Sequence, residues 1–217
     1  MRRAALLLAV VALAGCGKKA IPNQPPVKSG VDAQGCRAIK TPSLGKRTAP
    51  KPTQALDPKK TYDVTLVTNC GSFTFELDVK DSPRTTASFV SLVRRRFFVG
   101  TIFHRIVPGF VIQGGDPTGT GGGGPGYTTV DTPPKSTKYT VGVVAMAKTQ
   151  TEAPGTAGSQ FFVVTGPDAA TLGPDYAVLG HVTKGLDVAK RIGTMGDPTT
   201  QQPTRLIVIQ KTTVTVH

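Results

Sequence analysis

Apolar and polar side chains alternate along two neighbouring stretches of the 217-residue chain, the first of which is residues 62–68. There Tyr62, Val64 and Leu66 alternate with polar residues, which is typical of a strand with one buried face. The alternation recurs in residues 73–77, after a glycine that can turn the chain without steric cost. Two such stretches joined by a turn predict a β-hairpin.

A helical period follows the hairpin. Ser82 suits an N-cap, Pro83 suits the first helical position, and the arginine run 94–96 suits the end of a helix, where positive charge stabilises its dipole. These signals predict a helix from Pro83 to the arginine run, and a second short helix is expected over residues 186–192. The predicted apolar face of the first helix comprises Phe89, Val90, Val93 and Phe97.

The rest of the chain after residue 97 contains short apolar runs separated by turns. Many short strands with few helices predict a mainly β domain, either a sandwich or a closed barrel. Periodicity alone does not choose between these two architectures. The runs are Ile102–Val107, Phe110–Gln113, Val141–Ala147, Gln160–Val164, Ala177–Val182 and Leu206–Val216.

Composition divides the chain near residue 61. Residues 1–60 carry 12 Lys/Arg against 2 Asp/Glu and no aromatic side chain, whereas residues 61–217 carry 14 against 11 and all 13 aromatics. A segment without aromatics and rich in proline and lysine buries too little surface to offset its ordering entropy. We therefore expect a folded domain over 61–217 and a basic tether over 16–60. Because the charge lies mostly in the tether, we do not expect a nucleic-acid partner.

The N-terminus has the features of an export signal. Two arginines precede an apolar run over residues 4–14, which is too short to span a bilayer. The tetrad 13–16, Leu-Ala-Gly-Cys, resembles the bacterial lipobox. This resemblance implies a signal peptide over 1–15, diacylglycerol on Cys16 and a location outside the cytoplasm, on the outer face of the bacterial membrane. The alternative is an ordinary secretory signal that contains a cysteine. The basic tether either lies on lipid headgroups or cell-wall polymers, or is a solvated linker.

Searches for familiar catalytic patterns find little. The domain contains only three histidines, His104, His181 and His217, without metal-ligand spacing, and no nucleophile elbow. The glycine-rich stretch 119–126 lacks the lysine that completes a phosphate-binding loop. We therefore expect a domain that works without a metal, a covalent nucleophile or an organic cofactor.

One block of sequence resembles a known family. Residues 103–116, with Phe-His-Arg-Ile-Val-Pro-Gly-Phe followed by Val-Ile-Gln-Gly-Gly-Asp, resemble the cyclophilins, which are peptidyl-prolyl cis-trans isomerases. The resemblance continues through residues 119–122, 144–147 and 158–162 and covers essentially all of 61–217. It implies an eight-stranded antiparallel closed barrel capped by two helices.

The implied reaction suits the residue types. Rotation about an X–Pro bond is opposed by a barrier of about 18–20 kcal/mol, because resonance gives the amide double-bond character. Catalysis needs a donor that stabilises the twisted amide and an apolar slot that holds the proline ring, without a covalent step. Arginine suits the donor role because its guanidinium does not deprotonate in proteins.

The resemblance assigns roles to nine side chains. It makes Arg105 the donor, with Phe110 and Gln113 as its catalytic neighbours, Gln113 bonding the substrate backbone. His104 is interpreted as a structural histidine and Asp116 as a residue that anchors a loop. The expected substrate-binding residues are Val111, Ala147, Lys148, Phe162, Leu172 and Tyr176.

Four positions depart from the best-known members of the family. Val111 takes the place of Met, Lys148 that of Asn, Thr171 that of an indole-bearing Trp, and Tyr176 that of His. The missing indole predicts weak binding of cyclosporin, the cyclic peptide inhibitor of the family. None of these changes removes the arginine or the two phenylalanines, so we expect isomerase activity.

Two other functions are compatible with the same fold. The domain could be a surface-tethered chaperone or scaffold that binds peptides in the same groove with weak catalysis, or an adhesin-like barrel that ignores proline. An intact Arg105 favours the isomerase, because a pure binder has no need of a polarising donor. The expected partners are proline-containing exported or unfolded polypeptides and, through the lipid on Cys16, a membrane; we expect a monomer.

We expect different chemical states for the three cysteines of the chain. With Cys16 lipidated, Cys36 and Cys70 remain as a pair in an oxidising compartment. We predict a disulfide between them that pins the distal tether to the domain and leaves residues 17–35 free. The alternative is two free thiols.

Overall fold

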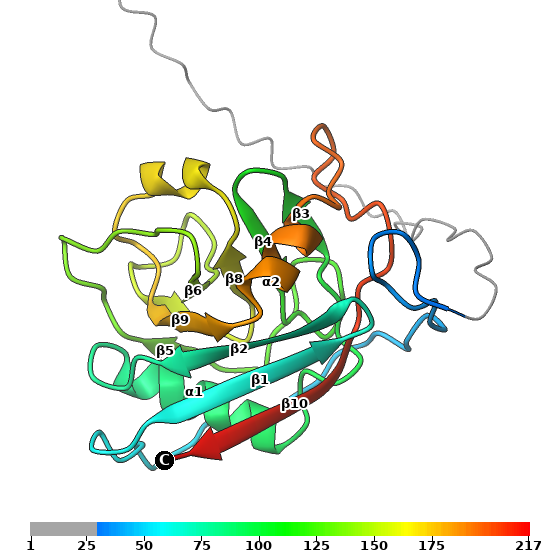
Figure 1. The fold of residues 1–217 in the computed structure, drawn as a ribbon. Coiled ribbons are helices and arrows are strands. Elements are labelled where there is room, and N and C mark those ends of the chain that lie inside the picture. The colour runs from blue at the N-terminus through cyan, green and yellow to red at the C-terminus, as the bar shows by residue number, and fades with distance from the viewer. Residues whose placement is uncertain (1–29) are drawn as a thin grey trace, which may run out of the picture.

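A computed structural model describes residues 30–217; the predicted signal peptide and Cys16 lie outside the described residues. One antiparallel sheet of eight strands, in the order β10-β1-β2-β9-β6-β8-β4-β3, dominates the fold (Figure 1). The mainly β prediction is therefore confirmed. The elements are β1 (Tyr62–Thr68), β2 (Gly71–Leu77), α1 (Pro83–Arg94), β3 (Arg105–Val107), β4 (Val111–Gly114), β5 (Thr129–Val130), β6 (Val143–Met146), β7 (Thr156–Ala157), β8 (Phe161–Val164), the 3-10 helix η1 (Pro167–Thr171), β9 (Val178–Lys184), α2 (Leu186–Gly193) and β10 (Ile209–Val216).

The predicted hairpin is confirmed as β1 and β2. Val64 and Leu66 of β1 and Phe73 and Phe75 of β2 are all 1% exposed or less, so the alternation in the sequence marks the buried face of both strands. Gly71 has a φ of +115°, a conformation that a side chain at this position would strain. Gly71 thus allows the tight turn that pairs β1 with β2 in the register that buries the apolar face of both strands.

The sheet curls, but a regular strand pair does not close it. Over the described residues no ladder joins the edge strands β3 and β10. Instead, Gly100 N–H donates to the carbonyl of Ile209 at 2.8 Å, Phe103 N–H donates to that of Ile207 at 3.0 Å, and Ile102 forms an isolated bridge. The segment before β3 and residues 207–209, at the start of β10, therefore make the join. The fold is a curled half-barrel. The closed barrel that the resemblance implied is therefore overstated, because no regular strand pair closes the sheet.

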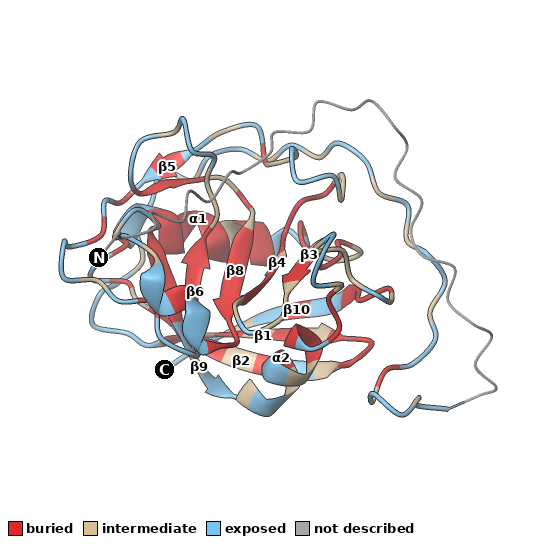
Figure 2. Cartoon of the chain, turned by 90° about the horizontal axis from the view of Figure 1, so that it is seen from above, coloured by how far each residue is buried: buried red, intermediate tan, exposed pale blue. Residues whose placement is uncertain are grey.

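Two helices cover the sheet, as predicted. Helix α1 packs against β5 and β10, whereas α2 packs against β2, β3 and β4. Buried residues run along β4, β6, β8 and α1 (Figure 2). Phe89 of α1 stacks on Phe98 with ring centroids 4.7 Å apart and meets Phe75 and Phe161 edge-on. This aromatic cluster fixes α1 on the sheet.

The start of α1 is capped in a way that its own sequence does not reveal. Ser82 occupies the N-cap position but makes no side-chain cap bond. The Thr85 N–H donates at 2.7 Å to a carboxylate oxygen of Asp131, a buried residue that directly follows β5. A carboxylate at a helix N-terminus satisfies a free N–H group and complements the helix dipole. Local propensity thus placed the helix start and its N-cap residue correctly, but the capping side chain is that of Asp131, which is distant in the sequence.

Residues 36–60, which we call the strap, lie against the domain. Their anchor is the disulfide between Cys36 and Cys70, which confirms the predicted pairing. Farther along, Gly45 N–H donates to the Pro117 carbonyl at 2.9 Å and Ala49 N–H to the Pro125 carbonyl at 3.0 Å. The disulfide was expected to pin this segment, but the expectation that the rest of it is an unfolded tether is corrected.

Aliphatic residues explain why the strap packs without aromatic side chains. Ile39 and Leu44 contact a small cluster on the outside of the join between the two sheet edges. Ala49 and Leu56 pack against the main core. Arg47 adds hydrogen bonds to the carbonyls of Phe97 and Val99. Each contribution is small, and composition averaged over 60 residues conceals them. The cluster under Ile39 and Leu44 consists of Ile102, Leu206 and Val208.

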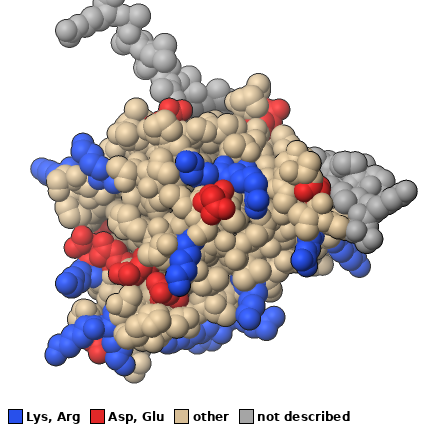
Figure 3. All heavy atoms as spheres, viewed as in Figure 1, with Lys and Arg blue, Asp and Glu red and all other residues tan. Residues whose placement is uncertain are grey.

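Charged side chains of both signs are interspersed on the face of the molecule seen in Figure 3. Within residues 30–217 no helix combines the length and the apolar character that crossing a bilayer requires.

The disulfide predicts a measurable stability difference. Replacing both Cys36 and Cys70 by Ser should lower the free energy of unfolding by about 3–4 kcal/mol, because a loop of roughly 35 residues is no longer closed in the unfolded chain. Urea unfolding of both proteins measures the difference. Reductant should destabilise the wild type and leave the double variant unchanged. Alkylation of both cysteines without prior reduction, detected by mass spectrometry, would contradict the pairing.

Candidate active site

Four side chains form a row across four adjacent strands. Arg105 of β3 pairs with Gln113 of β4, Gln113 with Phe162 of β8, and Phe162 with Ala145 of β6. Directly opposed residues of antiparallel strands place their side chains on the same face of the sheet. The backbone register alone therefore brings an arginine, an amide and a phenyl ring together on one surface.

A chain of hydrogen bonds orients the polar end of this row. Arg105 Nε donates to Gln201 Oε1 at 2.8 Å, and Arg105 Nη1 donates to Gln113 Oε1 at 3.3 Å. Gln113 Nε2 donates to Gln160 Oε1 at 3.1 Å, and Gln160 donates in turn to the carbonyl of Gly121 at 2.9 Å. These contacts hold the guanidinium on two sides. Sequence reasoning assigned no role to Gln160 or Gln201.

Gln201 reaches Arg105 from the loop between α2 and β10. Its backbone is left-handed, with a φ of +59°, which few residues other than glycine adopt. Its N–H donates to the Asp197 carbonyl at 2.8 Å, and its carbonyl accepts from Ile106 N–H at 2.9 Å. No feature of the sequence around Gln201 indicates this conformation, because one of these two backbone bonds comes from the distant strand β3.

An apolar cluster, separate from the main core, lies beside the row. It brings together Phe110 and the expected substrate-binding residues Val111, Phe162 and Leu172, with Ala147 and Tyr176 at its margin. Val111 and Phe162 are buried, whereas Phe110 and Leu172 are partly exposed, so the cluster is open to solvent on one side. The remaining members are Tyr139, Val143, Ala145, Val164, Ala169 and Val178.

Tyr139 fixes the rim of the slot, a role that the sequence did not reveal. Its hydroxyl donates to the carbonyl of Tyr176 at 2.7 Å and accepts from the Tyr176 N–H at 2.9 Å. The Tyr176 ring then meets Phe162 edge-on, with centroids 5.4 Å apart. Burial raises the pKa of Tyr139 to about 12 and also raises the pKa of Tyr176, so both phenols are neutral at physiological pH.

The positive charge of Arg105 has no counter-ion in the described part of the chain. Within residues 30–217 no carboxylate forms an ion pair with Arg105, and its side-chain bonds go to neutral amides. Burial lowers the pKa of Arg105, yet an arginine guanidinium remains protonated in proteins. The site therefore presents an uncompensated, half-buried cation next to an apolar slot.

Asp116 has the loop-anchoring role that was expected of it, whereas the structural role expected of His104 stays a prediction. Burial lowers the pKa of His104, and neither of its ring nitrogens has a hydrogen-bond partner among the described residues. Burial acts to raise the pKa of Asp116, but hydrogen bonds from Thr118, Gly121 and Gly123 outweigh it and hold the pKa below its usual value. Asp116 thus anchors the glycine-rich loop as a carboxylate.

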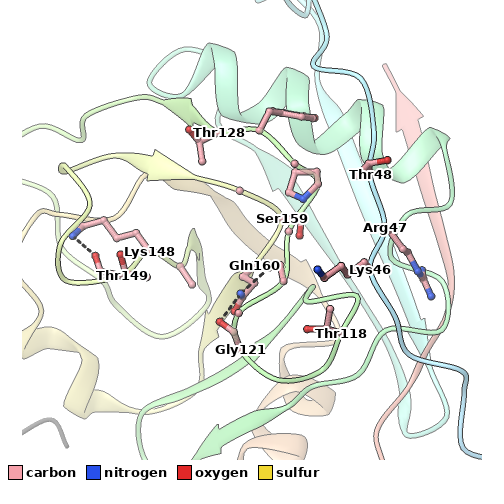
Figure 4. A pocket seen from close by; sticks show the side chains of 18 of the residues that line it. Lys46, Arg47, Thr48, Thr118, Gly121, Thr128, Lys148, Thr149, Ser159 and Gln160 are labelled. Carbon is pink, nitrogen blue, oxygen red and sulfur yellow. Dashed lines mark hydrogen bonds between the residues drawn. The ribbon is translucent and has the colours of Figure 1, made fainter. Parts of the chain in front are cut away.

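Two cavities flank Gln113. The smaller, about 250 Å³, is lined by His104, Arg105 and Gln201. The larger, about 650 Å³, runs from Gln113 and Ala147 toward the glycine-rich loop and the strap (Figure 4). Because Gln113 borders both, a peptide held in the apolar slot has room to extend past it.

Lys148 and Thr171 are two positions at which the sequence departs from the best-known members of the family. Lys148 Nζ donates to the carbonyls of Thr149 and Glu152, each at 3.1 Å, and lies 5.7 Å from the centroid of the Tyr176 ring. Thr171 is exposed at the end of η1 and donates to the Asp168 carbonyl. The structure thus places Lys148 beside the slot and Thr171 outside the apolar cluster.

Within residues 30–217 no group of His, Cys, Asp and Glu side chains is arranged to hold a metal ion. The chemistry that the described side chains offer is donation of hydrogen bonds by a fixed cation, together with burial of a small apolar ring. Such a site can stabilise an amide whose charge distribution changes as it twists.

Comparisons with known proteins agree with this geometry. Residues 63–214 match the family model for cyclophilin type peptidyl-prolyl cis-trans isomerases. A peptidyl-prolyl cis-trans isomerase of Arabidopsis thaliana is 40% identical over 156 residues, which are 70% of this chain and 93% of the relative. A Schizosaccharomyces pombe isomerase is 36% identical over 153 residues, which are 69% of this chain and 96% of the relative.

Solved structures show the same likeness. The crystal structure of a Cryptosporidium parvum cyclophilin type isomerase superposes with a TM-score of 0.65 at 31% identity, covering 71% of this chain and 98% of the other. The crystal structure of the same Cryptosporidium parvum isomerase in the presence of the dipeptide Ala-Pro gives a TM-score of 0.64 at 31% identity, covering 70% of this chain and 98% of the other. Sequence, fold and site agree, and the chain belongs to the cyclophilin family of peptidyl-prolyl cis-trans isomerases.

Proposed function

We propose that the chain isomerises X–Pro bonds of exported proteins in the groove beside Arg105, by non-covalent stabilisation of the twisted amide. The observation that carries this proposal is the uncompensated guanidinium, held on the same sheet face as Phe162. A site that only bound peptides would gain nothing from leaving a half-buried cation without a counter-ion. The isomerase is therefore favoured over a catalytically weak chaperone.

The mechanism follows from differential binding. Lowering the rotation barrier by about 5–6 kcal/mol accelerates isomerisation roughly ten-thousand-fold. The proline ring occupies the slot of Phe110, Phe162 and Leu172, which fixes one side of the bond while the other side turns. Arg105 donates to the substrate amide and the proline carbonyl, and its bonds strengthen as the amide loses resonance.

Gln113 positions the substrate backbone. Its side-chain amide is bonded to Arg105 on one side and to Gln160 on the other, so it has a defined orientation before a peptide arrives. Ala147 and Lys148 border the path of the extended peptide beyond it. Such preorganisation lowers the ordering cost of binding.

The export of the substrates and the location of the chain belong to the same proposal. The lipobox-like tetrad supports lipidation of Cys16 and attachment to the outer face of a bacterial membrane. The Cys36–Cys70 disulfide supports an oxidising compartment, where such bonds persist. Proline-containing segments of proteins that fold after export are the substrates that this location supplies.

Lipidation is tested by fractionation. In a bacterial host the wild type should be found with membranes, and Cys16→Ser should abolish attachment of a labelled fatty acid and release the chain. Cys36→Ser serves as the matched control and should still be labelled. Equal labelling of wild type and Cys16→Ser would contradict an anchor at this position.

The role of Arg105 predicts a large loss of turnover. Arg105→Ala should reduce kcat/KM for an Ala-Pro peptide by about 100- to 1,000-fold, the range typical for loss of one donor to a developing charge. Exchange between the cis and trans peptide signals, measured by NMR, gives the rate. Circular dichroism establishes that the variant is folded.

Arg105→Lys separates charge from geometry. Lysine keeps the cation but lacks the planar fork that bonds two acceptors at once, so an intermediate rate is expected. Full activity in Arg105→Ala would rule out the proposed donor.

A non-covalent mechanism also predicts an almost flat pH profile. Burial lowers the pKa of His104 below its ordinary value and raises that of Tyr176, while Arg105 stays protonated. None of the three changes its ionisation state between about pH 7 and about pH 9. The value of kcat/KM, measured by peptide exchange over this interval, should vary less than about twofold. A bell-shaped profile within it would indicate proton transfer in the mechanism.

A further inference from the structure

The larger cavity has a wall that lies outside the part of the chain that resembles the family. The family model begins at residue 63, whereas Lys46, Arg47 and Thr48 of the strap line the cavity. Gln113 and Ala147 line the same cavity on the side of the proline slot. A feature of this chain thus faces the path that a bound peptide would take.

The strap is fixed where it meets the cavity. The backbone bonds of Gly45 to Pro117 and of Ala49 to Pro125 lie on either side of these three residues. Leu44 fits so closely that a Cβ on Gly119 would lie 2.6 Å from its Cδ1. Lys46 therefore has a defined place on the rim.

The charged groups around the cavity differ in what they bind. Arg47 turns away and is occupied by the carbonyls of Phe97 and Val99, whereas the Lys46 side chain points toward Gln160 (Figure 4). Lys46 is exposed and has no hydrogen-bond or ion-pair partner among the described residues.

The other two charged residues that line the cavity are engaged on its opposite side. Lys148 is bonded to two backbone carbonyls. Glu152 accepts from the N–H and the hydroxyl of Thr149, at 2.6 and 2.9 Å. Among the charged side chains that line this cavity, Lys46 is the one without a hydrogen-bond or ion-pair partner in the described residues, so all its donors are available to a ligand.

We propose that Lys46 is a specificity-determining residue, which favours substrates with a Glu or Asp side chain near the isomerised proline. The inference rests on the proposed function and extends it to a substrate class. A peptide with its proline in the slot passes Gln113 and Ala147, so a neighbouring side chain enters the cavity. Residues 121–124, which line the cavity, are all glycine and carry no side chains. This leaves room for the carboxylate of the substrate to reach the ammonium group of Lys46.

The test compares matched peptides with the full chain. One peptide carries Glu and its partner carries Gln at the same position, and the position is moved over three residues on each side of an Ala-Pro bond. Peptide exchange measured by NMR gives kcat/KM for each. The variants are Lys46→Gln and Lys46→Glu, and Lys51→Gln is the matched control because Lys51 is an exposed strap lysine outside the cavity.

At low salt the wild type should favour Glu over Gln by about two- to five-fold at one or two positions, the range that an exposed ion pair allows. Lys46→Gln should bring the ratio to about one, Lys46→Glu should reverse it, and Lys51→Gln should leave it unchanged. Salt at 1 M should weaken the preference of the wild type.

A wild-type ratio of one at every position, or an unchanged ratio in Lys46→Gln, would overturn the assignment to Lys46. A loss of preference in Lys51→Gln would do the same, because it would indicate the general charge of the strap. In each of these cases, turnover of the Gln peptides would show that the proposed isomerase activity is still supported. Absence of turnover for all peptides would instead refute the proposed function and the inference together.

Discussion

The antiparallel pairing of β3, β4, β8 and β6 is the constraint on which the site depends. Arg105, Gln113 and Phe162 come from sequence positions up to 57 residues apart, yet each lies opposite the next in the ladder. A slip of one residue in any of these pairs would turn a side chain to the other face of the sheet. The fold therefore determines the distance between donor and apolar slot, and the side chains need only supply the chemistry.

Elements outside the sheet complete the geometry that the row begins. Gln201, from a loop in which its backbone is left-handed, and Gln160, which directly precedes β8, restrain the polar groups. Tyr139 holds Tyr176 over the slot, and the strap closes one end of the larger cavity. These contacts are all long-range, so the surroundings of the row depend on the segments that pack around the sheet.

Sequence reasoning succeeded where the signal was local or belonged to a motif. The alternation around Val64 and the helical period around Phe89 each reflect the burial of one face, which neighbouring residues record. Arg105 and Phe162 were placed by resemblance, and the structure brings them together. Composition and periodicity alone could not have placed them on one face, because only the strand register does so, with Gln113 between them.

The failures have a common physical cause. Asp131 caps α1 and Gln201 orients Arg105 through contacts between distant segments, which leave no local trace. The strap looked unfolded because packing was judged from average composition, whereas a disulfide, a few aliphatic contacts and several backbone hydrogen bonds are sufficient to hold it. Closure of the sheet was overstated because its edges join through irregular segments next to β3 and β10.

The central claim is that Arg105 and the apolar slot act on the same X–Pro bond. A crystal structure of the full chain with a bound Ala-Pro peptide tests this claim most directly. The account predicts that the proline ring lies against Phe110 and Phe162, with the guanidinium of Arg105 within hydrogen-bond distance of the peptide backbone. A peptide whose proline lies away from Phe162, or an Arg105 that still bonds only Gln113 and Gln201, would contradict it.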